Sequence, residues 1–227
     1  MITSSIIQRT FSIKAGDSSA TGFTVDIDNL QYLVTAKHVI ENLNKEDGLD
    51  VYHDGQWKEL PIKKLWMSDS GADLALISFH QQISPSHKVN LEPHSGYFLS
   101  QTAYFLGFPF GLKLEAGQTN NGYPVPFVKS AIISSFTLSK TGSETIFLDG
   151  LNNPGFSGGP IVTTNPDHST NIIGVVSGYR YSNDPIHING KDSGLTYKSN
   201  TGLVIGYTIK EILDEARSSQ SGAPLTS

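Results

Sequence analysis

Short apolar runs separated by turn residues recur along the first half of the chain. Runs of strand length, rich in β-branched and aromatic residues, occupy residues 22–27, 31–35, 49–53 and 73–79. This pattern predicts β-strands. Asp28 and Asn29 lie between the first two runs and favour a hairpin in which these runs pair. Val39 and Leu43, which are four residues apart, predict a short helix over 36–42.

A second group of short runs follows, at residues 103–108, 125–135, 145–149, 159–163, 172–177 and 203–207. Two groups of about six short strands predict an all-β fold of two antiparallel six-stranded β-barrels. Pro, Ser, His and Asn accumulate between the two groups, around residues 84–95. We therefore expect an N-terminal barrel over 1–90 and a C-terminal barrel with a closing helix over 91–217.

The closing helix is predicted from apolar residues at helical spacing, namely Ile209, Ile212, Leu213 and Ala216. Thr208, followed three residues later by Glu211, has the form of an N-terminal capping pair. Residues 218–227 lack the apolar side chains needed for packing. We expect them to form a loose tail.

Composition and charge exclude several classes of protein. The chain has 227 residues, a net charge of −5 and no stripe of Lys or Arg, so nothing supports a nucleic-acid partner. It contains no cysteine, which rules out a disulfide scaffold and favours a reducing compartment. No run reaches the roughly 18 apolar residues of a membrane span, and residues 1–10 lack the pattern of a secretory signal. We therefore expect a soluble, cytoplasmic protein with no membrane partner.

The most specific local signal surrounds Ser157. The sequence Asn-Pro-Gly-Phe-Ser-Gly-Gly-Pro at 153–160 places this serine among glycines just before an apolar strand. Gly155 lets the backbone turn so that its N–H and that of Ser157 point into one space, as an oxyanion hole requires. Gly158 and Gly159 leave the hydroxyl accessible. The alternative interpretation is a tight turn without chemistry.

A serine hydroxyl is a weak nucleophile, so a catalytic role requires a base and a carboxylate that orients the base. His38 directly follows a predicted strand and begins the short helix, where its imidazole is held rigidly. Asp73 begins a strongly apolar strand, where a charge is unfavourable unless it accepts a hydrogen bond from a partner such as His38. Asp69 is a competing carboxylate, and a cap would explain either residue without catalysis. The other histidines are predicted to lie on the surface: His53, His80, His87, His94, His168 and His187.

Three motifs in this order resemble those of the trypsin-like serine proteases: Thr-Ala-Lys-His38, Asp73-Leu-Ala-Leu and Gly155-Phe-Ser157-Gly-Gly-Pro. The segments at 22–26, 33–39, 148–155 and 201–209 most resemble the high-temperature-requirement (Deg-type) branch. The resemblance covers about residues 20–215. It implies two six-stranded barrels with the active site in the cleft between them.

The resemblance also implies the role of each site residue. Ser157 attacks the scissile carbonyl, His38 acts as general base and then as general acid, and Asp73 orients His38. The N–H groups of Gly155 and Ser157 form the oxyanion hole. The substrate-binding residues are Leu151, Asn152 and Asn153, which border the specificity pocket, and Ser177, Gly178 and Tyr179, which pair with the substrate backbone.

The expected substrate is a protein or peptide cut after small or medium apolar residues. No acid stands where trypsin carries its base-selecting aspartate. No cofactor is implied, and no metal site is expected because no cluster of His, Asp and Glu has ligand spacing.

Two departures from the family pattern affect regulation. Phe156 stands where digestive enzymes carry an aspartate, so activation by a newly cut N-terminus is not expected. The chain after the closing helix is too short for the PDZ domain that is usual in the Deg-type branch. Regulation is then expected from loops, an activator protein or a fused domain.

Two other functions fit part of the sequence. The Gly-Phe-Ser-Gly-Gly motif satisfies the nucleophile elbow of α/β-hydrolase esterases. In that fold, however, the acid and histidine follow the serine, and too little chain remains here for the further βα units. A catalytically silent trypsin-like domain that binds peptides or a partner protein is the stronger alternative.

Overall fold

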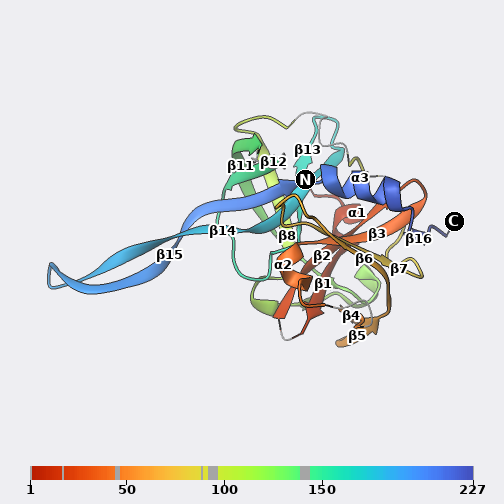
Figure 1. The fold of residues 1–227 in the computed structure, drawn as a ribbon, viewed down its shortest axis with the longest axis horizontal. Coiled ribbons are helices and arrows are strands. Elements are labelled where there is room, and N and C mark those ends of the chain that lie inside the picture. The colour runs from red at the N-terminus through yellow and green to blue at the C-terminus, as the bar shows by residue number, and fades with distance from the viewer. Residues whose placement is uncertain are drawn as a thin grey trace.

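The computed structural model describes residues 2–16, 18–43, 47–87, 89–91, 97–138 and 144–226. Two antiparallel sheets make up the body, and a two-stranded ribbon extends from it (Figure 1). The first sheet has the order β5-β4-β1-β2-β3-β7-β6. Its strands are β1 (Thr10–Ala15), β2 (Ser18–Ile27), β3 (Leu30–Thr35), β4 (Leu49–His53), β5 (Gln56–Leu60), β6 (Ile62–Met67) and β7 (Ala75–Phe79).

The second sheet is a closed barrel with the order β11-β12-β15-β14-β13-β8. Its strands are β8 (Thr102–Gly107), β11 (Phe127–Leu138), β12 (Glu144–Asp149), β13 (Pro160–Thr164), β14 (Thr170–Ile188) and β15 (Lys191–Thr208). The short pair β9 (Leu114–Glu115) and β10 (Pro124–Val125) lies outside both sheets, next to the 3-10 turns η1 (Pro109–Gly111) and η2 (Gly117–Asn120). The predicted all-β fold is confirmed. The first sheet, however, contains eight strands instead of six once β16 (Ala223–Pro224) is included.

The predicted hairpin between β2 and β3 is confirmed. Val25 pairs with Tyr32 in this hairpin. Asp28 and Asn29 have φ values of 50° and 63°, so both turn residues adopt the left-handed conformation of the turns that match strand twist. The short helix α2 (Lys37–Ile40) follows β3, as predicted.

Three clusters of buried apolar residues hold the fold together. One fills the first sheet around Phe11, Leu33 and Ile77, and another fills the barrel around Phe105 and Ile146. The third joins both sheets through Val34, Leu106 and Val162, and it includes residues of α3 (Lys210–Ser219). Because each buried Ile or Leu contributes about 1.5–3 kcal/mol, this shared core fixes one sheet against the other.

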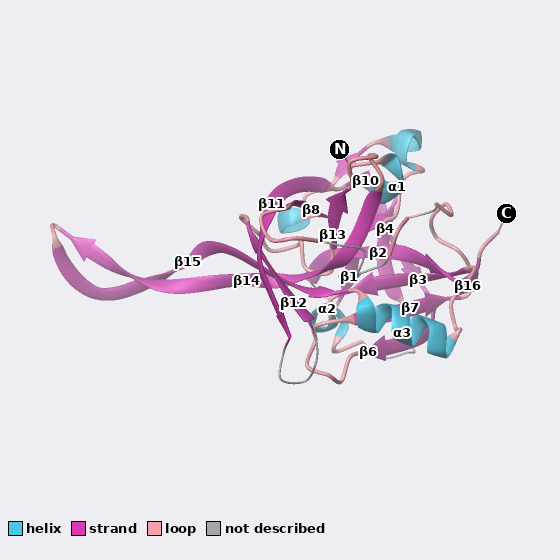
Figure 2. Ribbon diagram, turned by 90° about the horizontal axis from the view of Figure 1, so that it is seen from above, coloured by secondary structure: helices cyan, strands magenta, loops and turns pink. Residues whose placement is uncertain are grey.

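The predicted cap of α3 is wrong. Thr208 is the last residue of β15, and Ile209 occupies the N-cap position without a side-chain cap. Glu211 accepts hydrogen bonds from the hydroxyls of Ser68 and Ser70 instead. A tertiary partner for the carboxylate therefore replaces the local capping contact. Figure 2 shows α3 lying along the body beside β6 and β7.

The predicted loose tail is also wrong for the described residues up to 226. β16 pairs with β3, with Ala223 opposite Gln31, and only 1% of Ala223 is exposed. This edge is available because β7 pairs with β3 only from Leu33 onward. The tail is thus a short strand that covers an otherwise open sheet edge.

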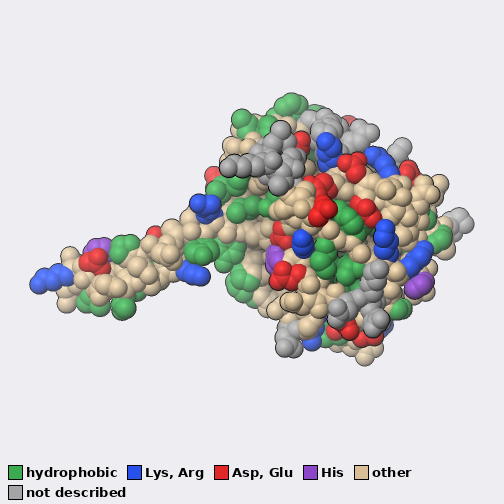
Figure 3. Space-filling view, viewed as in Figure 1, with side chains coloured by type: hydrophobic (Ala, Val, Ile, Leu, Met, Phe, Trp, Pro, Cys, Tyr) green, Lys and Arg blue, Asp and Glu red, His purple; other side chains and the backbone are tan. Residues whose placement is uncertain are grey.

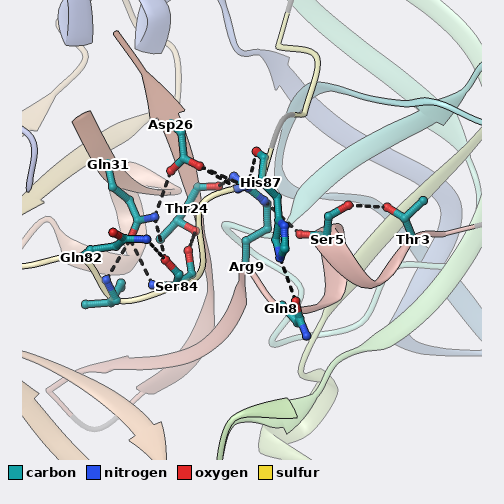
Figure 4. A network of polar contacts seen from close by, with 11 residues as sticks. Thr3, Ser5, Gln8, Arg9, Thr24, Asp26, Gln31, Gln82, Ser84 and His87 are labelled. Atoms are coloured by element: carbon teal, nitrogen blue, oxygen red, sulfur yellow. Dashed lines mark hydrogen bonds and ion pairs between the residues drawn. The ribbon is translucent and has the colours of Figure 1, made fainter. Parts of the chain in front are cut away.

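A buried polar network ties the N-terminal segment to the connection between the sheets (Figure 4). The Arg9 side chain, 1% exposed, donates to the carbonyl oxygens of Thr24 and His87, and its Nη2 lies 3.4 Å from an Asp26 carboxylate oxygen. His87 also lies 2.9 Å from the Gln8 side chain through its Nε2. The α1 helix (Ser4–Ile7) precedes this network. The buried guanidinium is therefore satisfied by acceptors on several segments.

Two of the histidines predicted to lie on the surface are half-buried. His87 belongs to the Arg9 network, and His53 Nε2 lies 2.9 Å from the carbonyl oxygen of Asn121. His80, His168 and His187 are exposed as predicted. His94 lies outside the described residues.

The ribbon is the long hairpin of β14 and β15. Tyr181 pairs with Asn200, and pairing continues to Ile188 and Lys191 at the tip. Asn189 and Gly190 form the turn, with φ values of 52° and 76°. We call residues 181–200 the arm. Figures 1 and 2 both show the arm extending away from the two sheets.

Candidate active site

His38 and Asp73 lie side by side where two paired strands of the first sheet, β3 and β7, meet at their ends. His38 is in α2, directly after β3, and Asp73 precedes β7, the strand that pairs with β3. His38 Nδ1 lies 2.6 Å from Asp73 Oδ2, and the backbone N–H of His38 donates to Oδ1 at 2.8 Å. An ionised carboxylate has no proton to give, so Nδ1 carries the proton. The other imidazole nitrogen, Nε2, is then free to accept one.

The same contacts shift the ionisation of both groups. The hydrogen bond with Asp73 raises the pKa of His38, against a smaller opposing effect of burial. Burial alone would raise the pKa of Asp73, but hydrogen bonds from His38 and Ser177 together lower it. Asp73 therefore stays ionised while His38 titrates.

Ser157 lies in the loop that precedes β13, a strand of the second sheet. Its hydroxyl donates to the carbonyl oxygen of Ser177 at 3.0 Å. The Ser177 hydroxyl in turn donates to Asp73 Oδ2 at 2.5 Å. Ser157, Ser177, Asp73 and His38 thus form one chain of contacts across the two sheets. Within the part of the chain that is described, no hydrogen bond joins Ser157 to His38.

The backbone around Ser157 is fixed on several sides. The N–H of Thr21 donates to the Ser157 carbonyl at 3.0 Å, and the N–H of Gly158 donates to Val176 at 2.7 Å. Gly158 has a φ of +83°, and a Cβ there would lie 2.1 Å from the carbonyl oxygen of Thr21. Only glycine fits this close approach of the two sheets.

A backbone contact with Phe110 fixes the peptide between Pro154 and Gly155. The carbonyl of Pro154 accepts from the N–H of Phe110 at 2.8 Å. Because the N–H and C=O of a trans peptide point in opposite directions, the Gly155 N–H points away from Phe110. Among the described residues, the N–H groups of Gly155 and Ser157 donate no hydrogen bond. Both donors are thus available for a developing negative charge.

Phe156 anchors the loop that contains Ser157 to the core of the barrel. Its side chain is fully buried and packs edge-on against Phe105, with ring centroids 5.0 Å apart. This apolar contact in the barrel core fixes the position of Phe156. Phe156 does not enter the space around Ser157.

Lys129, a residue that the sequence did not single out, binds the same loop. Its ammonium donates to the carbonyl oxygen of Leu151 at 2.6 Å and to Asn153 Oδ1 at 2.5 Å. It also lies 5.4 Å from the centre of the Phe156 ring. Burial lowers the pKa of Lys129. This lysine on β11 joins the two ends of residues 151–156.

Two of the predicted pocket residues differ in exposure. Leu151 is 54% exposed and its side chain is available to a ligand, whereas Asn152 is 1% exposed. The Asn152 side chain accepts from the N–H of Asn153, and its carbonyl accepts from the Asn200 side chain. Asn152 therefore shapes the loop from inside and its side chain does not line a pocket.

Ser177, Gly178 and Tyr179 lie where β14 loses one of its two neighbours. The pairing of β13 with β14 ends at Val175, and a β-bulge between Val176 and Gly178 contains Ser177. Among the described residues, the pairing of β14 from Gly178 onward is with β15. This edge begins beside the Ser157 hydroxyl.

Within the described ranges, no group of three or more His, Asp and Glu side chains could hold a metal ion. None of the helices in those ranges is both long and apolar enough to cross a bilayer.

Comparisons with known proteins identify a family and a fold. The family described as Trypsin-like peptidase domain matches residues 20–175. The inactive form of Rv3671c from M. tuberculosis H37Rv is similar over 98% of this chain and 91% of its own, with 14% identity and a TM-score of 0.59. The HtrA-type protease AlgW with tripeptide is similar over 95% of this chain and 62% of its own, with 21% identity and a TM-score of 0.59. No curated protein sequence gives a significant match.

Proposed function

Because the chain belongs to the family of trypsin-like peptidases, we propose that this serine protease is an endopeptidase that uses Ser157, His38 and Asp73. The observation that supports this assignment most directly is the chain of contacts that runs from Ser157 through Ser177 and Asp73 to His38. Its members come from both sheets, and one carboxylate accepts from three donors. A strand cap or a tight turn needs no such arrangement.

The first half of the reaction forms an acyl-enzyme. Ser157 Oγ attacks the scissile carbonyl carbon while its proton passes to His38 Nε2. The carbonyl oxygen becomes an oxyanion, and the free N–H groups of Gly155 and Ser157 stabilise it. His38 then gives the proton to the leaving amine as the C–N bond breaks. In the second half, water replaces Ser157 by the same proton transfers, with His38 as base and then as acid.

Before this reaction, the Ser157 hydroxyl must leave the Ser177 carbonyl and turn toward His38. A substrate that pairs with the Ser177 edge brings a backbone N–H to that carbonyl. Such an N–H competes with Ser157 for the acceptor. Substrate binding and release of the nucleophile are thus coupled in this proposal.

In this proposal, Leu151 and the loop that Lys129 holds border the specificity pocket next to Ser157. We propose a neutral, small or medium apolar residue before the scissile bond. The exposed Leu151 supports this choice because it adds apolar surface at the rim.

A second candidate function is peptide binding without catalysis. The hydrogen bond from Ser157 to Ser177, in place of one to His38, favours it. The two functions separate in one experiment, which compares the wild type with Ser157→Ala on unfolded casein and with a fluorophosphonate probe. Cleavage and labelling that disappear together in the variant support the peptidase. Binding of casein by both proteins, without cleavage or labelling, supports the binding domain.

A further inference from the structure

The arm has no core of its own. Every residue from 177 to 203 is at least partly exposed. Polar contacts join its strands, chiefly among Ser182, Asp184 and Ser199. A two-stranded ribbon in water is only marginally stable without a further layer. An arm of this length therefore requires a functional explanation.

Both faces of the arm are open to solvent, and large apolar side chains lie on it. The space-filling view shows the arm standing clear of the body, with apolar atoms along its length (Figure 3). These side chains are more than half exposed: Tyr181, Ile188, Leu195 and Tyr197. A polypeptide that lies along the arm would cover part of this surface.

The edge of β14 connects the arm to the nucleophile. Val176 is still bonded to the neighbouring loop through the Gly159 carbonyl. At the next residue, the Ser177 carbonyl faces Ser157 instead. Beyond Ser177, the side of β14 that β13 covered has no strand beside it among the described residues as far as Ile188. A row of backbone donors and acceptors thus continues from the reaction site along the arm.

The geometry points to the arm as an extension of the substrate-binding edge, on which an extended, unfolded polypeptide adds a strand to β14 far beyond the scissile bond. This inference rests on the proposed peptidase function. Its occupant is the segment of the substrate on one side of the cleaved bond. The continuity of the free edge with Ser157 favours a substrate over a second copy of this chain, which would have no reason to start at the nucleophile.

Main-chain pairing makes the arm selective for conformation instead of sequence. An added strand is held through its backbone, so many side chains are tolerated. At about 3.3 Å per residue, the edge from 177 to 188 offers on the order of 35 Å of pairing, far more than a tetrapeptide can use. Most folded proteins cover, shorten or charge their edge strands, so a free strand of this length is offered chiefly by unfolded chains. The substrate class is therefore unfolded protein, and short peptides gain nothing from the arm.

The test shortens the arm at a defined register. Ser182 pairs with Ser199, so replacement of residues 183–198 by Asn-Gly closes a two-residue hairpin between them. A cleavage site is mapped in unfolded casein, and peptides around it are lengthened on one side or the other. We expect kcat/KM of the shortened variant to stay within about twofold on the shortest peptide and to fall about tenfold or more on the peptides long on one side.

A matched control keeps the ribbon and removes its aromatic side chains. The double variant Tyr181→Ser, Tyr197→Ser should retain the gain in kcat/KM with peptide length, because the backbone edge remains. Equal losses on short and long peptides in the shortened variant would overturn the inference. Loss of a dimer on shortening, measured by light scattering, would also overturn it because a second copy would then be the occupant.

A binding measurement separates this inference from the proposed peptidase function. In the Ser157→Ala background, fluorescence anisotropy with labelled casein should show weaker binding for the shortened arm by about tenfold. If the wild type cleaves nothing but the shortened arm binds casein more weakly, the proposed peptidase function is wrong and the arm still binds unfolded chains. If the wild type cleaves casein and arm length changes neither binding nor cleavage, the arm inference alone fails.

Discussion

At the scale of single residues, the His38–Asp73 contact sets the pH range of activity. His38 must be neutral to accept a proton, and the hydrogen bond with Asp73 raises its pKa. The acid limb of kcat/KM should therefore lie above the ordinary pKa of histidine. Asp73→Asn removes the charge that favours protonated His38, so the limb should move to lower pH while kcat falls by about 10⁴-fold. A pH profile on a casein-derived peptide measures both changes.

Ser177→Ala is the control for this prediction. It removes a hydrogen bond from the same carboxylate but leaves His38 its partner. The loss of kcat should be much smaller than for Asp73→Asn. Similar losses in the two variants would mean that Asp73 acts through the Ser177 position and not through His38.

Lys129 should position the loop of residues 151–156 without touching the reacting atoms. Lys129→Met removes two hydrogen bonds from a charged donor to residues 151–153, and kcat should fall about 10- to 100-fold with little change in KM. Lys129→Arg keeps the charge and the donors, and should recover most of the activity. Steady-state kinetics and the rate of fluorophosphonate labelling measure the effect. A rise in KM alone would instead place Lys129 in substrate binding.

The sequence could identify those site residues whose neighbours in the chain form a specific motif. His38, Asp73 and Ser157 carry motifs, and the structure brings them to one place. Lys129 is a single lysine in a strand and carries no signal, because its role depends on a loop more than twenty residues away. The position of the Ser157 hydroxyl could not be predicted either, since its contact with the Ser177 carbonyl depends on the side-chain rotamer.

At the scale of elements, the loop before β13 depends on glycine at one point of close contact. Gly158→Ala would place a Cβ 2.1 Å from a Thr21 oxygen at a φ of +83°. We expect a loss of at least about 3 kcal/mol in the free energy of unfolding, measured by urea denaturation. Gly178→Ala is the matched control, because a Cβ there meets nothing within 4 Å. Equal losses in both variants would mean that the close contact with Thr21 does not set the cost.

Local turn chemistry predicted some elements and could have predicted others. The Asp28-Asn29 hairpin was found from its turn residues. The Asn189-Gly190 turn of the arm carries an equally strong hairpin signal, but its flanking strands lack the apolar alternation that predicts a strand. The Thr208 and Glu211 pair had the right spacing for a cap, and the hydroxyls of Ser68 and Ser70 took the carboxylate instead.

At the scale of the whole molecule, the C-terminal strand should stabilise the first sheet. Deletion of residues 221–227 removes the β16 pairing and the buried Ala223. We expect the free energy of unfolding to fall by about 2 kcal/mol, with kcat/KM unchanged well below the melting temperature. Calorimetry and a peptide assay at low temperature test the two parts. Unchanged stability would show that β16 contributes no net energy at this edge.

Two sheets and a closing helix were predictable because apolar patterning repeats along the chain. The eighth strand of the first sheet was not predicted, because two residues, Ala223 and Pro224, are too few to show an apolar alternation, and they pair only because β3 has a vacant edge. The predicted division at residue 90, the reducing compartment and the activator stay predictions.

The shared core has a consequence for how the enzyme is made in the cell. Ile212, Leu213 and Ala216 belong to the core that fixes the two sheets together, and they follow His38, Asp73 and Ser157 in the sequence. A ribosome therefore releases both halves of the active site before these core residues, so the two halves cannot be held in register when they first emerge. We therefore expect a nascent chain to be proteolytically silent until α3 has emerged, which protects both the unfinished chain and its neighbours from premature cleavage.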